Sequence, residues 1–210
     1  MILTFDDASY THLSFIKKGD GNIYVNPNTV VGILQQFSQK YPDFGYAGAF
    51  FIDFDNPPFG NVETASIQIQ YLIGQGFELG AHSISGRNFS DFTLKEIQDE
   101  MAQSKILLES ISERPVQYFA VPGGFLPEDV DPRELLSYDY TDNVDIEFVA
   151  FLKITNSVNP SPNDPEFLSG GLLKRWEVKN EKEFSRFLEY RKTYASDGVP
   201  DNSPVIVSDK

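Results

Sequence analysis

The sequence predicts an α/β domain built on a mainly parallel sheet. Apolar runs typical of buried strands alternate along the chain with stretches of helical spacing, and the connections between them are short. Polar residues also gather directly after several of these strands, where ligands of such sheets bind. A sheet of this size either stays open or closes into a barrel.

The expected elements follow one another in a regular order. Strands are predicted at 1–5, 46–54, 77–83, 146–155, 172–178 and 204–208, with a shorter one in "VQYFAVPGG". "TVVGILQQFSQKY" has helical spacing, and "TASIQIQYLIGQG" is assigned to a helix because of its length and its closing Gly-x-Gly. In "TLKEIQDEMAQSKILLESI", Thr93 and Glu96 form a capping-box pair, and Asn180 can cap a last helix that runs to Lys192.

The composition indicates one globular domain over residues 1–210. Hydrophobic residues make up 40% of the chain, and the formal net charge is −14. Such a charge argues against nucleic acid or an anionic membrane surface as partner, since both need clustered Lys and Arg. The absence of cysteine excludes disulfides and thiolate metal sites. No apolar run approaches the ~20 residues of a membrane span, and no signal-peptide pattern is found. The first strand begins at Met1 itself, so we expect that an upstream segment is missing.

Asp6 and Asp7 come directly after the first predicted strand. Consecutive strand residues face opposite sides, so both carboxylates can enter one site only if the strand ends and turns between them. One carboxylate can then hold a metal while the other acts as a base. The alternative is that one of them caps the following turn through its backbone.

The chain has two histidines, and they are expected to differ in role. His82 ends an apolar strand, where an imidazole can serve as a metal ligand or a general acid, or can simply be a core residue bonded to backbone. His12 lies in a polar loop and is expected to be solvated. The turn at Pro122 and Gly123 either presents backbone N–H groups to an anion or is merely a turn.

Three stretches together resemble the polysaccharide deacetylases (carbohydrate esterase family four, the chitooligosaccharide deacetylase homology domain). "LTFDDAS" resembles the family's first motif, "FELGAHSISGRNFSDFT" its second and "YFAVPGGF" its third, while "NPSPND" and "YASDGVPDN" are similar to stretches of a secreted bacterial branch. The resemblance implies a distorted (β/α) barrel of about seven parallel strands. It also implies a metal-dependent hydrolase that removes acetyl groups from N- or O-acetylated sugars, in the cell envelope or outside the cell.

The family's site residues carry over by position. Asp6 matches the catalytic base, and Asp7 and His82 match two ligands of a divalent metal, zinc or similar. The family's third ligand is a histidine that falls at Gly86, so we expect the metal to be weakly bound or absent. Tyr10, Pro122 and Gly123 are assigned to binding of the acetylated oligo- or polysaccharide.

Further departures from the family pattern leave three functions open. Ala81 stands where Asn is usual, Ala120 falls where many members carry an Arg that orients the base, and Ser208 falls at the place of the general acid. The chain is therefore expected to be an active deacetylase or a degenerate member that binds glycan without turnover. A third possibility is a barrel enzyme of another class, with Asp6 and His82 as a metal-free acid–base pair.

Overall fold

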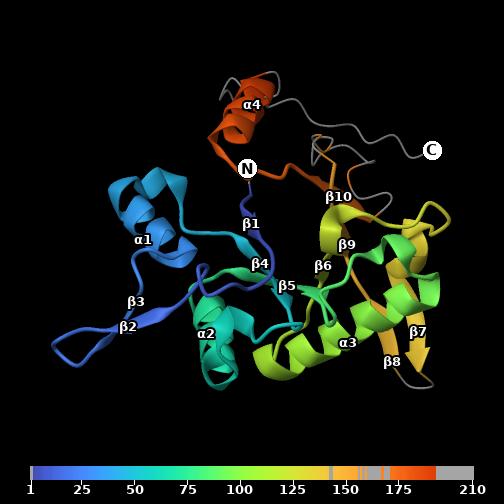
Figure 1. The fold of residues 1–210 in the computed structure, drawn as a ribbon, viewed down its shortest axis with the longest axis horizontal. Coiled ribbons are helices and arrows are strands. Elements are labelled where there is room, and N and C mark those ends of the chain that lie inside the picture. Colours follow the sequence, from blue (N-terminus) through green and yellow to red (C-terminus); the bar gives the residue numbers. More distant parts are fainter. Residues whose placement is uncertain are drawn as a thin grey trace, which may run out of the picture.

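The centre of the protein is a six-stranded parallel sheet with the order β1-β4-β5-β6-β9-β10 (Figure 1). The computed structural model describes residues 2–141, 144–155, 157, 159, 167 and 171–192. The strands are β1 (Thr4–Phe5), β4 (Ala49–Asp53), β5 (Glu78–Ser83), β6 (Tyr118–Ala120), β9 (Ala150–Ile154) and β10 (Leu172–Arg175). The α/β class is confirmed.

The sheet is curled into a half-barrel. β1 and β10 are its opposite edges, yet the Arg175 guanidinium at the end of β10 lies 2.6 Å from the Asp6 carboxylate just beyond β1. A distorted barrel is therefore confirmed, with six strands in the described residues where about seven were predicted. The predicted strand at 204–208 lies outside the residues that the structure describes.

The described residues contain four α-helices, and their predicted places are confirmed. They are α1 (Val30–Lys40), α2 (Val62–Gly74), α3 (Leu94–Ser112) and α4 (Glu181–Lys192). The predicted capping box is present: Glu96 N–H donates to Thr93 Oγ1, and Thr93 N–H donates to Glu96 Oε2. Asn180 Oδ1 accepts from Glu183 N–H at 3.0 Å, as expected of a residue that caps α4.

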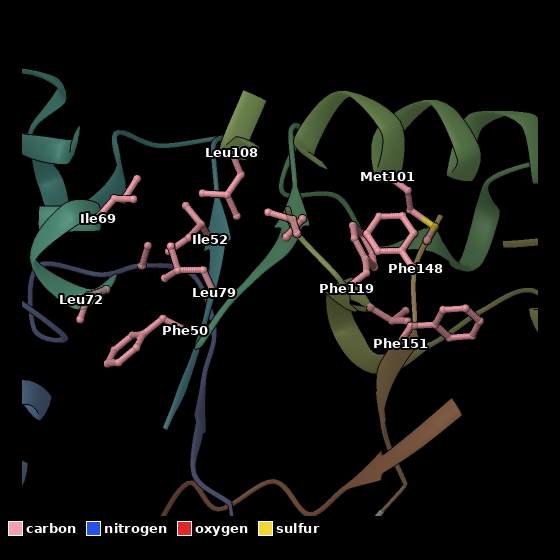
Figure 2. Packing of buried hydrophobic residues seen from close by; sticks show 14 of the residues in the cluster. Phe50, Ile52, Ile69, Leu72, Leu79, Met101, Leu108, Phe119, Phe148 and Phe151 are labelled. Atoms are coloured by element: carbon pink, nitrogen blue, oxygen red, sulfur yellow. The ribbon is translucent and has the colours of Figure 1, made fainter. Parts of the chain in front are cut away.

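Alternating strand residues divide the sheet into two different faces. One face packs against α2 and α3 in the main core, where Figure 2 shows side chains from the sheet meeting those of both helices; its strand residues are Phe50, Ile52, Leu79, Ala81, Phe119 and Phe151. The opposite, inner face carries a smaller cluster of Ala49, Phe51, Ala120 and Leu152. The main core of the protein therefore lies between the sheet and the helices α2 and α3.

The predicted strand at 146–155 is confirmed only over β9 (Ala150–Ile154), because the segment is divided between two sheets. Its first part belongs to β8 (Val144–Glu147), which pairs antiparallel with β7 (Ser137–Thr141), and the chain joins the parallel sheet only at β9. A second hairpin, β2 (Phe15–Lys17) with β3 (Ile23–Val25), was not predicted either. Five short 3₁₀ segments complete the described elements: Pro42–Phe44, Pro58–Gly60, Phe89–Asp91, Pro122–Gly124 and Pro132–Leu135.

The capping box gives a direct test of how α3 begins. We expect Thr93→Ala to lower the free energy of unfolding by about 1 kcal/mol, because Glu96 N–H loses its acceptor. Thr93→Ser retains the hydroxyl and serves as the control. Urea unfolding curves with the same midpoint for the two variants would contradict the assigned cap.

Candidate functional site

The first motif contains a sharp turn that sends its two carboxylates in different directions. β1 ends at Phe5, and the next residues include two with left-handed backbone, Asp7 at φ 69° and Ala8 at φ 43°. Non-glycine residues in this region carry a cost of order 1 kcal/mol or more, and such strain is frequent at functional sites. As a result, Asp6 faces β10 while Asp7 faces the end of β5.

Asp6 is held by a two-pronged ion pair with Arg175. Arg175 Nη1 lies 2.6 Å from Asp6 Oδ1 and Nη2 lies 2.9 Å from Oδ2, which is the fork geometry that matches a carboxylate. The arginine side chain is 10% exposed and stacks at 5.6 Å over the ring of Phe51 on the inner face. This pair fixes the position of Asp6 and was missed from the sequence, because Arg175 lies in the middle of the predicted strand 172–178, whereas the observed strand β10 ends at it.

His82 is buried at the end of β5 and is oriented by a backbone carbonyl. Its Nδ1 lies 2.7 Å from Ala120 O, so Nδ1 carries the proton and donates. Its Nε2 lies 3.3 Å from Asp7 Oδ1, which brings the two predicted metal ligands together. Burial alone would lower the pKa of His82, but the hydrogen bond to Asp7 and the charge of Asp6 outweigh it and raise the pKa above its usual value. The same hydrogen bond is the main cause of the lowered pKa of Asp7.

The donor chemistry of Asp7 and His82 fits a divalent cation. With the proton on Nδ1, the neutral imidazole turns the lone pair of Nε2 toward a carboxylate oxygen, and two such lone pairs need a proton or a cation between them. A third ligand is not in place: within the described residues no group of three or more His, Cys, Asp or Glu side chains is positioned to hold a metal ion.

Gly86, where the family resemblance implies the third ligand, has little room for a side chain. Its φ is +64°, and a Cβ built there would lie 2.9 Å from Asp55 Cβ and 3.0 Å from Asp55 Oδ2. Asp55 follows β4, and its neighbour Asp53 is a half-buried carboxyl whose pKa is raised by burial. The end of β4 thus adds two carboxyl groups to the region, and neither was predicted from the sequence.

The loop that carries Gly86 is anchored by α3. Glu100 Oε2 accepts hydrogen bonds from Ser83 Oγ, Ile84 N–H and Ser85 N–H at 3.1–3.2 Å. Ser83 Oγ in turn accepts from Gly86 N–H at 2.8 Å. This set of bonds fixes the loop after β5, and Glu100 was not singled out in the sequence because it lies inside a helix.

The three residues predicted to bind substrate differ in their exposure to solvent. Tyr10 is 67% exposed in the loop after Asp7. Pro122 is buried, whereas Gly123 is exposed with φ +66° and lies so close to Asn88 that a Cβ would come within 2.7 Å of its Nδ2. One amide of this turn, Gly124 N–H, is used internally by Val121 O, which leaves less for an anion than the sequence suggested.

The expectation that His12 is solvated is wrong. Its ring is half-buried, with centroids 5.9 Å from Phe5 and 6.1 Å from Phe50, and its Nδ1 accepts from Ser9 N–H. Burial is the main cause of its lowered pKa. His12 therefore packs beneath the first motif as a neutral ring.

Comparisons with known proteins show the family and the fold of the chain. The sequence profile described as polysaccharide deacetylase matches residues 1–141. The fold is similar to a deacetylase from Streptococcus pyogenes in complex with acetate, with a TM-score of 0.58 and 14% identity over 90% of this chain and 68% of that one. It is also similar to a polysaccharide deacetylase from Bacillus cereus, with a TM-score of 0.55 and 18% identity over 88% of this chain and 50% of that one.

A further structural match covers less of the chain and has a lower TM-score. A pseudoenzyme of carbohydrate esterase family four from Bacillus anthracis matches with a TM-score of 0.41 and 16% identity over 60% of this chain, and the chain spans only 36% of that protein's length. No curated protein sequence matches the chain. Among the described helices, none has the length and apolar character needed to cross a bilayer.

The anchoring of the loop after β5 can be tested through Glu100. We expect Glu100→Ala to lower the free energy of unfolding by about 2 kcal/mol, because hydrogen bonds to a charged acceptor are lost and two backbone N–H groups lose a partner. Asp99→Ala on the same helix removes only the exposed pair with Lys95 and is the matched control. Equal denaturant midpoints for the two variants would show that the loop does not depend on Glu100.

Proposed function

This chain belongs to the polysaccharide deacetylase family, and we propose that it removes acetyl groups from acetylated sugars at the site formed by Asp6, Asp7 and His82. The observation that carries the proposal is the 3.3 Å approach of Asp7 Oδ1 to His82 Nε2, beside an Asp6 held for a separate task. These residues lie at the carboxyl ends of β1 and β5, which are separated by β4 in the sheet, and such sheets bind ligands at that end.

Asp6 is the proposed base. Its two oxygens are held at 2.6 and 2.9 Å by Arg175, which keeps the carboxylate oriented toward the centre of the half-barrel. A base in this position accepts the proton of the water that attacks the acetyl carbonyl, a contribution of about 10²–10⁴-fold to rate. Arg175 is the proposed positioning residue, in place of the Arg that the family pattern has at Ala120.

Asp7 and His82 are the proposed metal ligands. A divalent cation bound there would polarise the acetyl carbonyl and make a bound water more acidic. The contact supports this assignment over the metal-free acid–base pair of Asp6 and His82, because His82 Nε2 faces Asp7 while both oxygens of Asp6 are engaged by Arg175.

An acetylated oligo- or polysaccharide is the proposed partner. Sugars bind by stacking on exposed rings, and two aromatic side chains that flank the motifs are exposed: Tyr10 at 67% and Phe125 at 60%. Phe59 is 3% exposed and belongs to the core, so it offers no surface for stacking. The family resemblance favours a polymer of the cell envelope or of the extracellular space.

Binding of glycan without turnover is the second candidate function. Gly86 favours it, because the family's third ligand is missing there. The sequence has no histidine other than His12 and His82, so the family's general acid has no counterpart of the same type. The predicted counterpart, Ser208, lies outside the described residues.

Acetate release separates the two candidates. We expect the protein to release acetate from N-acetylated chito-oligosaccharides or from O-acetylated xylo-oligosaccharides, and Asp6→Asn to reduce the rate by about 10²–10⁴-fold because the base is removed. Circular dichroism of Asp6→Asn checks the fold. Oligosaccharide binding with no acetate from the wild-type protein on either substrate would decide for the glycan-binding function.

The role of Arg175 has its own test. We expect Arg175→Lys to lower kcat at least about tenfold with a smaller change in KM, because an ammonium cannot hold both oxygens of Asp6. Lys174→Gln, next to it in β10 with an exposed side chain, is the control. A change confined to KM, or unchanged kinetics, would remove Arg175 from the positioning role.

A further inference from the structure

We propose that Phe51 is a positioning residue, because its ring holds the Arg175 guanidinium in place against the Asp6 carboxylate. The inference rests on the proposed function and deepens it. Asp6 is the proposed base, Arg175 orients that base, and Phe51 supports the arginine. Phe51 therefore acts through Arg175 and not on the substrate.

The Arg175 guanidinium is buried, and Asp6 satisfies only part of it. The arginine side chain is 10% exposed, and its Nη1 and Nη2 donate to the two oxygens of Asp6. Nη1 has a longer contact with Thr4 Oγ1 at 3.5 Å. Arg175 Nε is buried and has no hydrogen-bond partner within the described residues. A buried cation with an unpaired donor is costly, so its position also depends on the surface that it packs against.

That surface is the ring of Phe51. Arg175 Cζ lies 5.6 Å from the ring centroid, within the ~6 Å over which a cation is attracted to an aromatic face. The attraction is stronger when the two groups are removed from water, and Phe51 is 1% exposed. Phe51 lies on β4, and β5, β6 and β9 separate β4 from β10 in the sheet order. The two side chains therefore meet across the inside of the half-barrel.

The ring is itself held in place by Gly80. This glycine is the register partner of Phe51 in the neighbouring strand β5. A Cβ built on Gly80 would lie 2.3 Å from Phe51 Cε1 and 2.4 Å from Cδ1, so the ring lies directly over the glycine backbone. Gly80 is not among the residues with positive φ, and the missing side chain therefore matters for space. Ala49, Ala120 and Leu152 complete the cluster around the ring.

The alternative role for Phe51 is to fill a core. It belongs to a cluster of only four buried residues on the inner face, whereas other buried phenylalanines of the sheet belong to the main core. Phe151 of β9 is one of these, is 0% exposed and points into the main core (Figure 2). Removing either ring loses buried apolar area, but only the ring of Phe51 is stacked on the guanidinium. Phe151 is therefore the matched control.

Kinetics of acetate release provide the first test. We expect Phe51→Leu to lower kcat at least about fivefold with a smaller change in KM, because the base is held less well while the substrate contacts remain. Phe151→Leu should lower the denaturant midpoint as Phe51→Leu does, but keep the wild-type kcat. Equal kcat values of the two variants would overturn the proposal.

A double-mutant cycle tests the contact without any need for activity. Urea unfolding of the purified full chain is measured for Phe51→Leu, for Arg175→Met and for the two combined. We expect the effects on the unfolding equilibrium constant to be non-additive by at least about threefold, because each substitution removes the same contact. Phe151→Leu combined with Arg175→Met should be additive. Additive effects in both cycles would overturn the proposal.

Gly80→Ala displaces the ring without removing it. Because the new Cβ would overlap Phe51 Cε1, the ring has to shift, and we expect kcat to fall at least about fivefold with a smaller change in KM. Circular dichroism verifies that the variant is folded. A folded Gly80→Ala protein with the wild-type kcat would show that the arginine does not depend on the position of the ring.

The outcomes separate this inference from the proposed function. A non-additive cycle for Phe51 and Arg175, without acetate release by the wild-type protein, would support the contact and contradict deacetylation. Acetate release with an unchanged kcat in Phe51→Leu and Gly80→Ala would overturn the inference and leave deacetylation in place.

Discussion

The ion pair between Arg175 and Asp6 connects the two edges of the sheet. It also fixes the position of a carboxylate in the candidate site. β1 and β10 are separated by four strands in the sheet order, and the pair connects them at 2.6 Å. Within the described residues no strand pairing joins β1 to β10, and the contact of the Arg175 guanidinium with the Asp6 carboxylate connects these two edges instead. Because the arginine is almost fully buried, separating the pair would leave a charge poorly solvated, which is costly. The curvature of the sheet and the position of the proposed base are therefore set together.

The turn after β1 explains how adjacent aspartates serve different purposes. In a continuing strand, Asp6 and Asp7 would face opposite sides of the sheet. Left-handed backbone at Asp7 and Ala8 breaks that alternation and brings the Asp7 carboxylate to His82, while Asp6 stays on the inner face with Arg175. The strain is retained because the surroundings fix it: Ala8 is buried, and its carbonyl accepts from Phe59 N–H. The strained turn thus brings polar groups from separate strands close together.

The departures from the family pattern are single residues, and the loops that carry them keep their hydrogen bonds. Hydrogen bonds among Ser83, Glu100 and the amide of Gly86 hold the loop after β5 in a fixed shape, although Gly86 stands where the family resemblance implies a histidine. Arg175, which we propose takes the role of the Arg that the family resemblance implies at Ala120, binds the Asp6 carboxylate from β10. A lost side chain in one motif can be replaced from a different element whenever the carboxyl ends of the strands bring both to one rim.

The sequence by itself determined the alternation of elements, the parallel α/β class and the rim on which Asp6, Asp7 and His82 lie. These follow from local patterns: apolar runs, capping pairs such as Thr93 with Glu96, and charge at strand ends. Only the tertiary structure decided that residues 144–147 leave the main sheet, that the His12 ring contacts Phe5 and Phe50, and that Arg175 binds Asp6. The physical reason is that these features depend on contacts between residues far apart in the chain. Arg175 is 169 residues from Asp6, and only the curling of the sheet brings the two side chains together.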